Sequence, residues 1–241
     1  VEKCLGCHRK GGIGSWAMND FETVKGFAPM IREVVRTQRM PPWHADPEIG
    51  HWEEDRSLSP SETRILVDWV EQGAVRGAGI DPLPDMQSAP EPWPLGKPDL
   101  IFDIPSTEIP ATGVLDYQFP KIENALDGDQ WIVAADILPG EPKALHHTYA
   151  GAVHGAEYDP LVAARDNYII AWSPGNTFGK MPEGTAIYLP PNATLTFEMH
   201  YTPFGKKVVD ESQLALYISS DPPKRMLRYG EILNTSMKLP A

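Results

Sequence analysis

The chain has 241 residues, of which 41% are hydrophobic, and it carries 33 acidic and 21 basic side chains for a net charge of −12. This length and apolar content support one large domain or two small ones and exclude a fully disordered or collagen-like chain. The negative charge repels phosphate backbones and anionic lipids, so we expect no nucleic-acid partner. The longest apolar runs, such as residues 168–172, are far shorter than the ~18 residues that indicate a membrane span, so none is expected here.

Both cysteines of the chain lie in one short motif, Cys4-Leu5-Gly6-Cys7-His8. This C-x-x-C-H spacing is typical of c-type haem attachment, because two thiols can add to the two vinyl groups of one porphyrin while the next residue places an imidazole under the iron. A thioredoxin-like motif needs a preceding strand and a zinc site needs a second ligand pair, and neither is present. We therefore predict one covalent haem c at Cys4 and Cys7, with His8 as an iron ligand, and no structural disulfide.

The second axial ligand of this iron is expected within the next several tens of residues, from a methionine or another histidine. Met40 is the preferred candidate, since it follows a predicted helix over residues 29–38 and opens a stiff turn with Pro41 and Pro42. Met30 lies on the apolar stripe of that helix and is interpreted as core packing. The alternatives also include Met18, close to the attachment motif, and two histidines that suit surface or loop positions better, His44 and His51.

A capped helix is predicted after this turn. Ser59-Pro60-Ser61-Glu62 forms a capping box with proline at the first helical position, and an apolar face follows until Gly73 ends the helix. The attachment motif, the Met-Pro turn and this helix together resemble a class I cytochrome c over residues 1–78. Such domains usually have a helix before the attachment motif, and only three residues precede it here, so we expect that the chain starts late or that this helix is missing.

The composition changes at residues 81–98, which contain six prolines and are typical of a semi-rigid spacer. Beyond this spacer the apolar pattern has a period of two, which predicts strands at residues 100–104, 130–133, 168–172, 193–201 and 213–218. Short strands separated by turn residues favour an antiparallel sandwich over βαβ units. The expected fold class is multidomain: a small all-α class I cytochrome c domain (1–80), a proline-rich linker (81–98) and an all-β, jelly-roll-like sandwich (99–241).

Four of the seven histidines lie in the second predicted domain, namely His146, His147, His154 and His200. Imidazole suits copper, zinc and non-haem iron. Neighbouring residues of a regular strand point to opposite faces, so His146 and His147 could share a metal only at a bulge, a strongly twisted edge or a strand end. His200 alternates with the apolar Met199, which we interpret as a core residue. His200 therefore lies on the polar face, as a ligand or as an ordinary solvent-facing histidine.

Four motifs follow one another in this half of the chain, at Leu145–Tyr149, Ile170–Gly175, Met181–Ala186 and Phe197–Pro203. Over residues 99–235 their order resembles the N-terminal copper domain of the type II, ascorbate-dependent copper monooxygenases, the family of the peptidylglycine α-hydroxylating and dopamine β-monooxygenases. The whole chain resembles bacterial fusions of cytochrome c with such an enzyme. The resemblance implies one copper at His146, His147 and His200. His154 has no counterpart among these ligands, so we expect it to contact a ligand without binding the metal or to lie on the surface.

The resemblance also implies what these residues lack. The oxygen-activating copper of the family is held by a His-x-His motif and a Met in a further β-domain, and no histidine follows His200. We therefore expect that the chain ends before that domain. The implied function is electron transfer, in which the haem passes single electrons to the copper and substrate hydroxylation takes place elsewhere.

A second hypothesis is a haem-bearing redox or accessory subunit of a larger complex, in which the β-domain is a non-catalytic docking platform. A haem-based sensor is less favoured, because it would need an open sixth iron position. An acidic surface suits docking to a basic electron-donor or electron-acceptor protein. Covalent haem attachment implies export, so a bacterial periplasmic or other extracytoplasmic location is expected.

Overall fold

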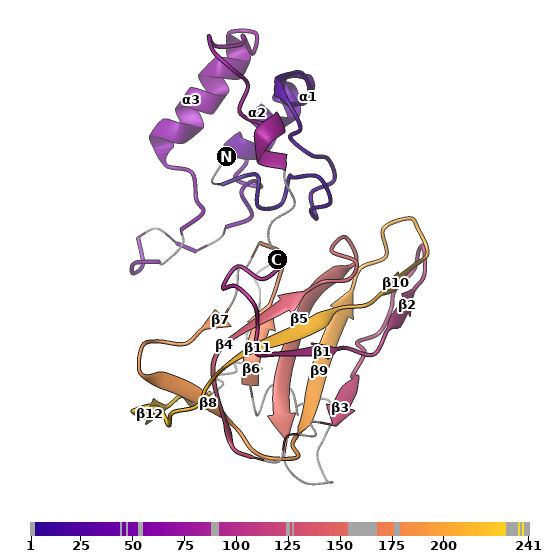
Figure 1. Cartoon of the computed structure of the whole chain (residues 1–241). Helices are drawn as coiled ribbons and strands as arrows, with labels where there is room; N and C mark the ends of the chain where they lie inside the picture. The colour runs from indigo at the N-terminus through magenta and orange to yellow at the C-terminus, as the bar shows by residue number, and fades with distance from the viewer. Residues whose placement is uncertain are drawn as a thin grey trace. The chain divides into compact units, whose positions relative to one another are not determined.

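A computed structural model describes residues 3–43, 45–46, 48–52, 55–87, 92–123, 126, 128–153, 168–175, 179–229, 236 and 238. The chain divides into two compact units, residues 1–90 and residues 91–241 (Figure 1). These are called the first and second unit below. The described helices lie in the first unit and the described strands lie in the second.

The first unit contains short helices joined by turns: α1 (Phe21–Gly26), α2 (Ala28–Arg36), α3 (Pro60–Glu71) and the 3-10 helix η1 (Pro84–Gln87). The Asp20 carboxylate caps α1 by accepting the Thr23 amide at 2.7 Å. The predicted capping box begins α3, because the Ser59 hydroxyl accepts the Glu62 amide while the Glu62 carboxylate accepts the Ser59 amide. Gly73 follows the C-cap with a φ of 89°, so the predicted start and end of this helix are confirmed.

The predicted fold class is wrong, because the first unit is not an all-α class I cytochrome c domain. Its three α-helices have 6, 9 and 12 residues, and the rest of its described part is mostly turns, bends and loops. The regular secondary structure of the described part of the chain is mostly β, with twelve strands. Glycines at positions 6, 11, 12 and 14 disfavour helix before α1. The predicted helix 29–38 is real but ends at Arg36, before Gln38 adopts a φ of 55°.

The helices of the first unit bury few of their apolar side chains, most of which are half-buried. No residue of α1 or α3 is buried, and α2 buries only Ala28 and Val35. Met30 of α2 is 53% exposed, so its interpretation as a core residue is wrong. An ion pair between Arg32 and Glu71, 2.9 Å apart, joins α2 to α3. None of the helices in the described part of the chain has the length and apolar character needed to cross a lipid bilayer.

The second unit is built from strands. Their bounds are β1 (Leu100–Asp103), β2 (Thr107–Ile109), β3 (Lys121–Glu123), β4 (Gln130–Leu138), β5 (Leu145–Val153), β6 (Tyr168–Trp172), β7 (Gly179–Lys180), β8 (Thr185–Leu189), β9 (Thr194–Tyr201), β10 (Val208–Asp210), β11 (Gln213–Ser219) and β12 (Arg225–Met226). The five strands predicted from the period-two pattern are present as β1, β4, β6, β9 and β11. β6 has the predicted bounds, β1, β9 and β11 differ from the prediction by one residue, and β4 extends five residues further than predicted.

The strands form two larger sheets and one two-stranded ribbon. The first sheet has the order β1-β11-β4-β8-β12 with β7 beside β4, the second has the order β3-β9-β5-β6, and the ribbon joins β2 to β10. All of these pairs are antiparallel except the pair of β8 with β12. Apolar residues of both larger sheets belong to one buried cluster, in which Phe197 and Met199 of β9 pack with Leu214 and Leu216 of β11. This shared core fixes β5 and β9, which carry the histidines discussed below (Figure 1).

One carboxylate is buried in the first sheet. Asp136 of β4 is 4% exposed, and its Oδ1 accepts the Ile137 amide at 2.8 Å. Burial raises the pKa of Asp136 from 3.8 to about 7, and the hydrogen bond from Ile137 opposes this shift only in part. The folded protein therefore holds a proton on Asp136 over a pH range in which the unfolded chain has released it.

This proton uptake predicts a pH-dependent stability. The contribution of Asp136 to the free energy of unfolding should fall as pH rises from about 4 to about 7, because Asp136 keeps its proton there in the folded state and has released it in the unfolded chain. In Asp136→Asn this fall should be absent, since the ionisable group is gone. Urea unfolding of both proteins at a series of pH values measures the difference. Parallel pH dependences for the two proteins would contradict the raised pKa.

Candidate metal centre

A β-bulge brings the two adjacent histidines of β5 to the same side of the second sheet. In the ladder between β5 and β9, Leu145 pairs with Tyr201 and His147 pairs with His200, which leaves His146 as the additional residue of the bulge. An extra residue in one strand changes the direction in which its neighbours point. A bulge is one of the local geometries that the sequence analysis required for His146 and His147 to share a metal, so that condition is met.

The three histidines converge on one point. One ring nitrogen from each histidine lies within 4.8 Å of one ring nitrogen from each of the other two. Nδ1 of His146 lies 3.1 Å from Nδ1 of His147 and 3.3 Å from Nδ1 of His200. A tetrahedral ion with metal–nitrogen bonds of about 2.0–2.1 Å separates its donors by roughly 3.3–3.4 Å. The three imidazoles, here called the histidine triad, therefore have the chemistry and spacing of a metal site.

The triad lies at the surface rather than in the core. His146 is exposed, whereas His147 and His200 are half-buried. Burial lowers the pKa of His200, and the nearby His146 lowers it further, while Glu198 opposes them. A lowered pKa favours the neutral imidazole, which is the form that binds metals. Three protein ligands leave a further coordination position of a four-coordinate ion open to water or a small ligand.

The rest of β9 is more buried than the alternating pattern predicts. Met199 has no exposed surface, which confirms it as a core residue, and its sulfur accepts the Thr148 hydroxyl at 2.8 Å. The face that His200 shares with Thr194, Thr196 and Glu198 is polar, but those three residues are buried as well. His200 is therefore not a histidine on a plain solvent face. His154, the fourth histidine of this half of the chain, lies outside the described residues.

Tyr117 is part of the site and was not predicted. Its ring stacks on His200, with centroids 4.6 Å apart and planes 14° from parallel, and its hydroxyl lies 3.3 Å from Nε2 of His147. With Nδ1 turned toward the triad, Nε2 of His147 is placed to donate to this hydroxyl, an arrangement that orients ligand imidazoles in metalloproteins. Tyr117 is positioned by Gln118, which exchanges two backbone hydrogen bonds with Met199. The pair of Gln118 with Met199 is an isolated β-bridge outside the named strands, so no local sequence pattern predicts it.

The predicted haem attachment motif forms a tight turn in the first unit. The Cys7 and His8 amides donate to the Cys4 carbonyl at 3.2 and 3.0 Å. Nδ1 of His8 lies 2.9 Å from the Trp16 carbonyl, which leaves Nε2 for a metal. A Cβ at Gly14 would lie 2.8 Å from Nδ1 of His8, so glycine leaves room for the ring. These contacts fit an imidazole that ligates iron through Nε2.

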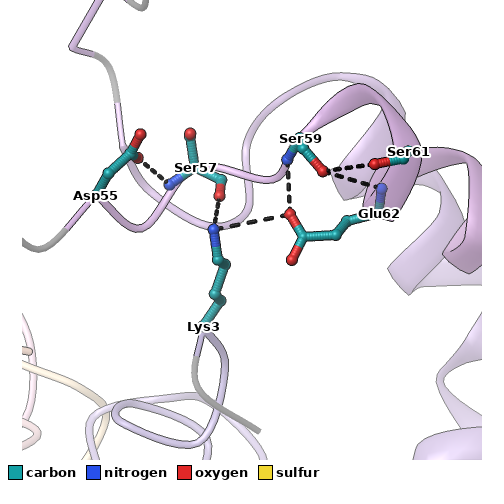
Figure 2. Close-up of polar contacts among 6 residues, drawn as sticks. All are labelled: Lys3, Asp55, Ser57, Ser59, Ser61 and Glu62. Atoms are coloured by element: carbon teal, nitrogen blue, oxygen red, sulfur yellow. Dashed lines mark hydrogen bonds and ion pairs between the residues drawn. The ribbon is translucent and has the colours of Figure 1, made fainter. Parts of the chain in front are cut away.

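Figure 2 shows how the start of this motif is held to α3. Nζ of Lys3 donates to the Ser57 carbonyl and lies 3.7 Å from Oε2 of Glu62. The same Glu62 oxygen accepts the Ser59 amide at 2.8 Å as part of the capping box. Hydrogen bonds from Ser59, assisted by the charge of Lys3, lower the pKa of Glu62. The residue before Cys4 is thus connected to the N-terminus of α3.

The candidates for the second axial ligand of iron lie in several places. Met40 follows α2 in a turn in which its amide donates to the Val34 carbonyl at 3.1 Å, and its side chain is exposed. The Met18 amide donates to the His8 carbonyl at 2.8 Å. Met30 and His51 are exposed, and His44 lies outside the described residues. The assignment of Met40 stays a prediction.

The burial pattern of the first unit fits a large apolar group. In its described part only four apolar residues are buried, namely Leu5, Ala28, Val35 and Ala74. Its exposed large apolar residues include Met30, Met40, Ile49, Trp52, Ile65, Val75 and Ile80. A porphyrin is a planar apolar surface that side chains of this kind can cover.

Comparison with known proteins identifies no family. A scan against models of protein families finds no match, and a search of curated proteins finds none either. The assignment of the two sites therefore depends on their residues and geometry.

Replacement of Tyr117 should weaken metal binding. Tyr117→Leu removes the ring on His200 and the hydroxyl at His147, and we expect the affinity for Cu²⁺ to fall by about tenfold. Tyr117→Phe keeps the ring and should lose less. Tyr188→Leu is the matched control, because both tyrosines are 40% exposed and Tyr188 donates to Asp129 instead. Competition titrations measure the affinities, and equal values for Tyr117→Leu and Tyr188→Leu would exclude this role.

Proposed function

We propose that this chain is an electron-transfer protein that carries one covalent haem c in its first unit and one copper ion in its second. In this proposal single electrons pass from the haem to the copper of a copper-monooxygenase-like protein. The observation that carries the proposal is the convergence of His146, His147 and His200 at the bulge. When bound, haem iron and copper each exchange one electron at a time, which suits both groups to electron transfer.

The second unit supplies a firm ligand set for copper. His147 and His200 are paired across a continuous ladder, so their backbone positions are held by the strands and by the core beneath them. Tyr117 restrains two of the rings. Imidazole binds copper well, and a ligand set that does not rearrange favours fast electron exchange. Only the exposed His146 lies outside the regular ladder.

The first unit supplies the residues for haem. Cys4 and Cys7 would form the thioether bonds, and His8 would ligate the iron through Nε2 while its Nδ1 is held by Trp16. Met40 is the proposed second axial ligand. Because covalent attachment of haem takes place after export, we propose a periplasmic or other extracytoplasmic location in bacteria. The net charge of −12 favours a basic redox partner.

Substrate hydroxylation is not assigned to these residues. The chain has seven histidines, and none follows His200. The described residues contain one group of histidines, cysteines or carboxylates that fits a metal ion, which is the triad itself. We therefore assign the triad the role of electron acceptor and assign no second metal site among the described residues.

The copper-to-iron ratio of the purified chain, measured by elemental mass spectrometry, tests this proposal. We expect about one copper per iron, with copper lost in His147→Ala because two imidazoles hold the ion much less tightly than three. His154→Ala is the control, since this histidine is not among the predicted ligands. Iron without copper, even after copper loading and dialysis, would refute the relay. Zinc in place of copper would refute it as well.

Met40→Ala tests the haem ligand. Loss of the thioether should remove the long-wavelength sulfur-to-iron absorption band of the oxidised protein. Met30→Ala, which changes another exposed methionine of the first unit, should leave this band intact. A band that persists in Met40→Ala would instead assign the position to another methionine, with Met18 as the next variant to measure, whereas absence of the band from the wild type would point to His44 or His51.

A further inference from the structure

Asp210, the last residue of β10, accepts hydrogen bonds from three parts of the second unit. Its Oδ2 accepts the Tyr201 hydroxyl at 3.0 Å and the Ser212 hydroxyl at 2.7 Å. Its Oδ1 accepts the Glu141 amide at 2.8 Å. Asp210 is 2% exposed, and a buried carboxylate is tolerated where such donors replace water. These four residues are called the Asp210 network.

The network holds both strands of the metal centre beyond the bulge. Tyr201 directly follows the histidine ligand of β9. The Glu141 carbonyl accepts the Leu145 amide at 3.0 Å, where the chain enters β5. Leu145 pairs with Tyr201 as the first ladder pair beyond the bulge. One carboxylate therefore connects the β9 ligand with the turn that leads into the two β5 ligands.

The register at this end decides where His147 points. Without the bulge, the ladder would pair His147 with Met199 in place of His200. Directly paired residues lie on the same face of an antiparallel sheet, and Met199 lies on the buried face. His147 would then point into the core, and the triad would be reduced to two imidazoles.

Gly140 allows the close approach on which the network depends. A Cβ atom at this position would collide with the backbone of Glu211, the residue between Asp210 and Ser212. The Gly140 amide also donates to the Ser212 hydroxyl at 3.2 Å. The turn before β5 is thus packed directly against the segment that carries the carboxylate.

From these contacts we propose that Asp210 is a positioning residue of the metal centre and that it holds the bulge in register through Tyr201 and Glu141. This inference rests on the proposed function in one respect, namely that the histidine triad binds copper. Asp210 acts on the positions of the ligands and leaves their identity unchanged. Its effect is therefore expected in the affinity and geometry of the metal site.

The test compares two variants of the network with two matched variants elsewhere in the same unit, all in the full chain. Asp210→Asn and Tyr201→Phe weaken the network. Asp136→Asn changes another buried aspartate, and Tyr217→Phe changes another buried tyrosine, whose hydroxyl donates to Gly96. Competition with a chelator gives the Cu²⁺ affinity, the electron paramagnetic resonance spectrum of bound Cu²⁺ reports ligand geometry, and thermal unfolding of the metal-free protein reports stability.

Both network variants should bind Cu²⁺ about tenfold more weakly than the wild type and show an altered spectrum. The two control variants should leave affinity and spectrum unchanged even where they lower the unfolding temperature. The double variant should lose little more than the weaker-binding single variant, because both substitutions act through one contact.

Two results would overturn the inference in different ways. If the wild type binds Cu²⁺ and the network variants bind it as the controls do, Asp210 has no positioning role while the proposed function stands. If the wild type binds no Cu²⁺, the proposed function fails and the positioning role fails with it. Should Asp210→Asn not fold, Tyr201→Phe decides the same question, since it removes a single hydroxyl.

Discussion

The metal centre depends on one departure from regular strand geometry. Side chains of a regular strand alternate between faces, so His146 and His147 could not both reach His200 from an unbroken ladder. The bulge in β5 removes this restriction at the cost of one unpaired residue. The surrounding structure keeps that residue in place, through the continuous ladder toward Val153 on one side and the pair of Leu145 with Tyr201 on the other. The site is thus a local irregularity held between regular segments.

The sequence was most informative where local patterns decide the structure. The period-two alternation located β1, β4, β6, β9 and β11, and the Ser59 and Glu62 capping box located α3. The prediction of an all-α domain failed because a resemblance of motifs was extended to the whole first unit. Apolar residues at helical spacing predict a helix, but they do not show that another part of the protein covers its apolar face. Met30 is an example, because it lies on such a face and is exposed.

The candidate ligands could be predicted, but the residues that support them could not. Adjacent histidines and a later histidine before a tyrosine are visible in the sequence, and so is the need for a bulge to bring them together. Tyr117 and Asp210 reach the site through contacts with residues far away in the chain, at His147 and Glu141. No local sequence pattern predicts such contacts, because these positions come together only when the strands pair.

The unequal burial in the two units has a consequence for cooperativity. The second unit contains a large shared core, whereas the described part of the first unit buries four apolar residues. Hydrophobic burial provides most of the free energy that opposes chain entropy, so units with such different cores are expected to differ in stability. We therefore expect each unit to have its own unfolding temperature. Calorimetry would record separate transitions, and a change in either unit should be assigned to its own transition.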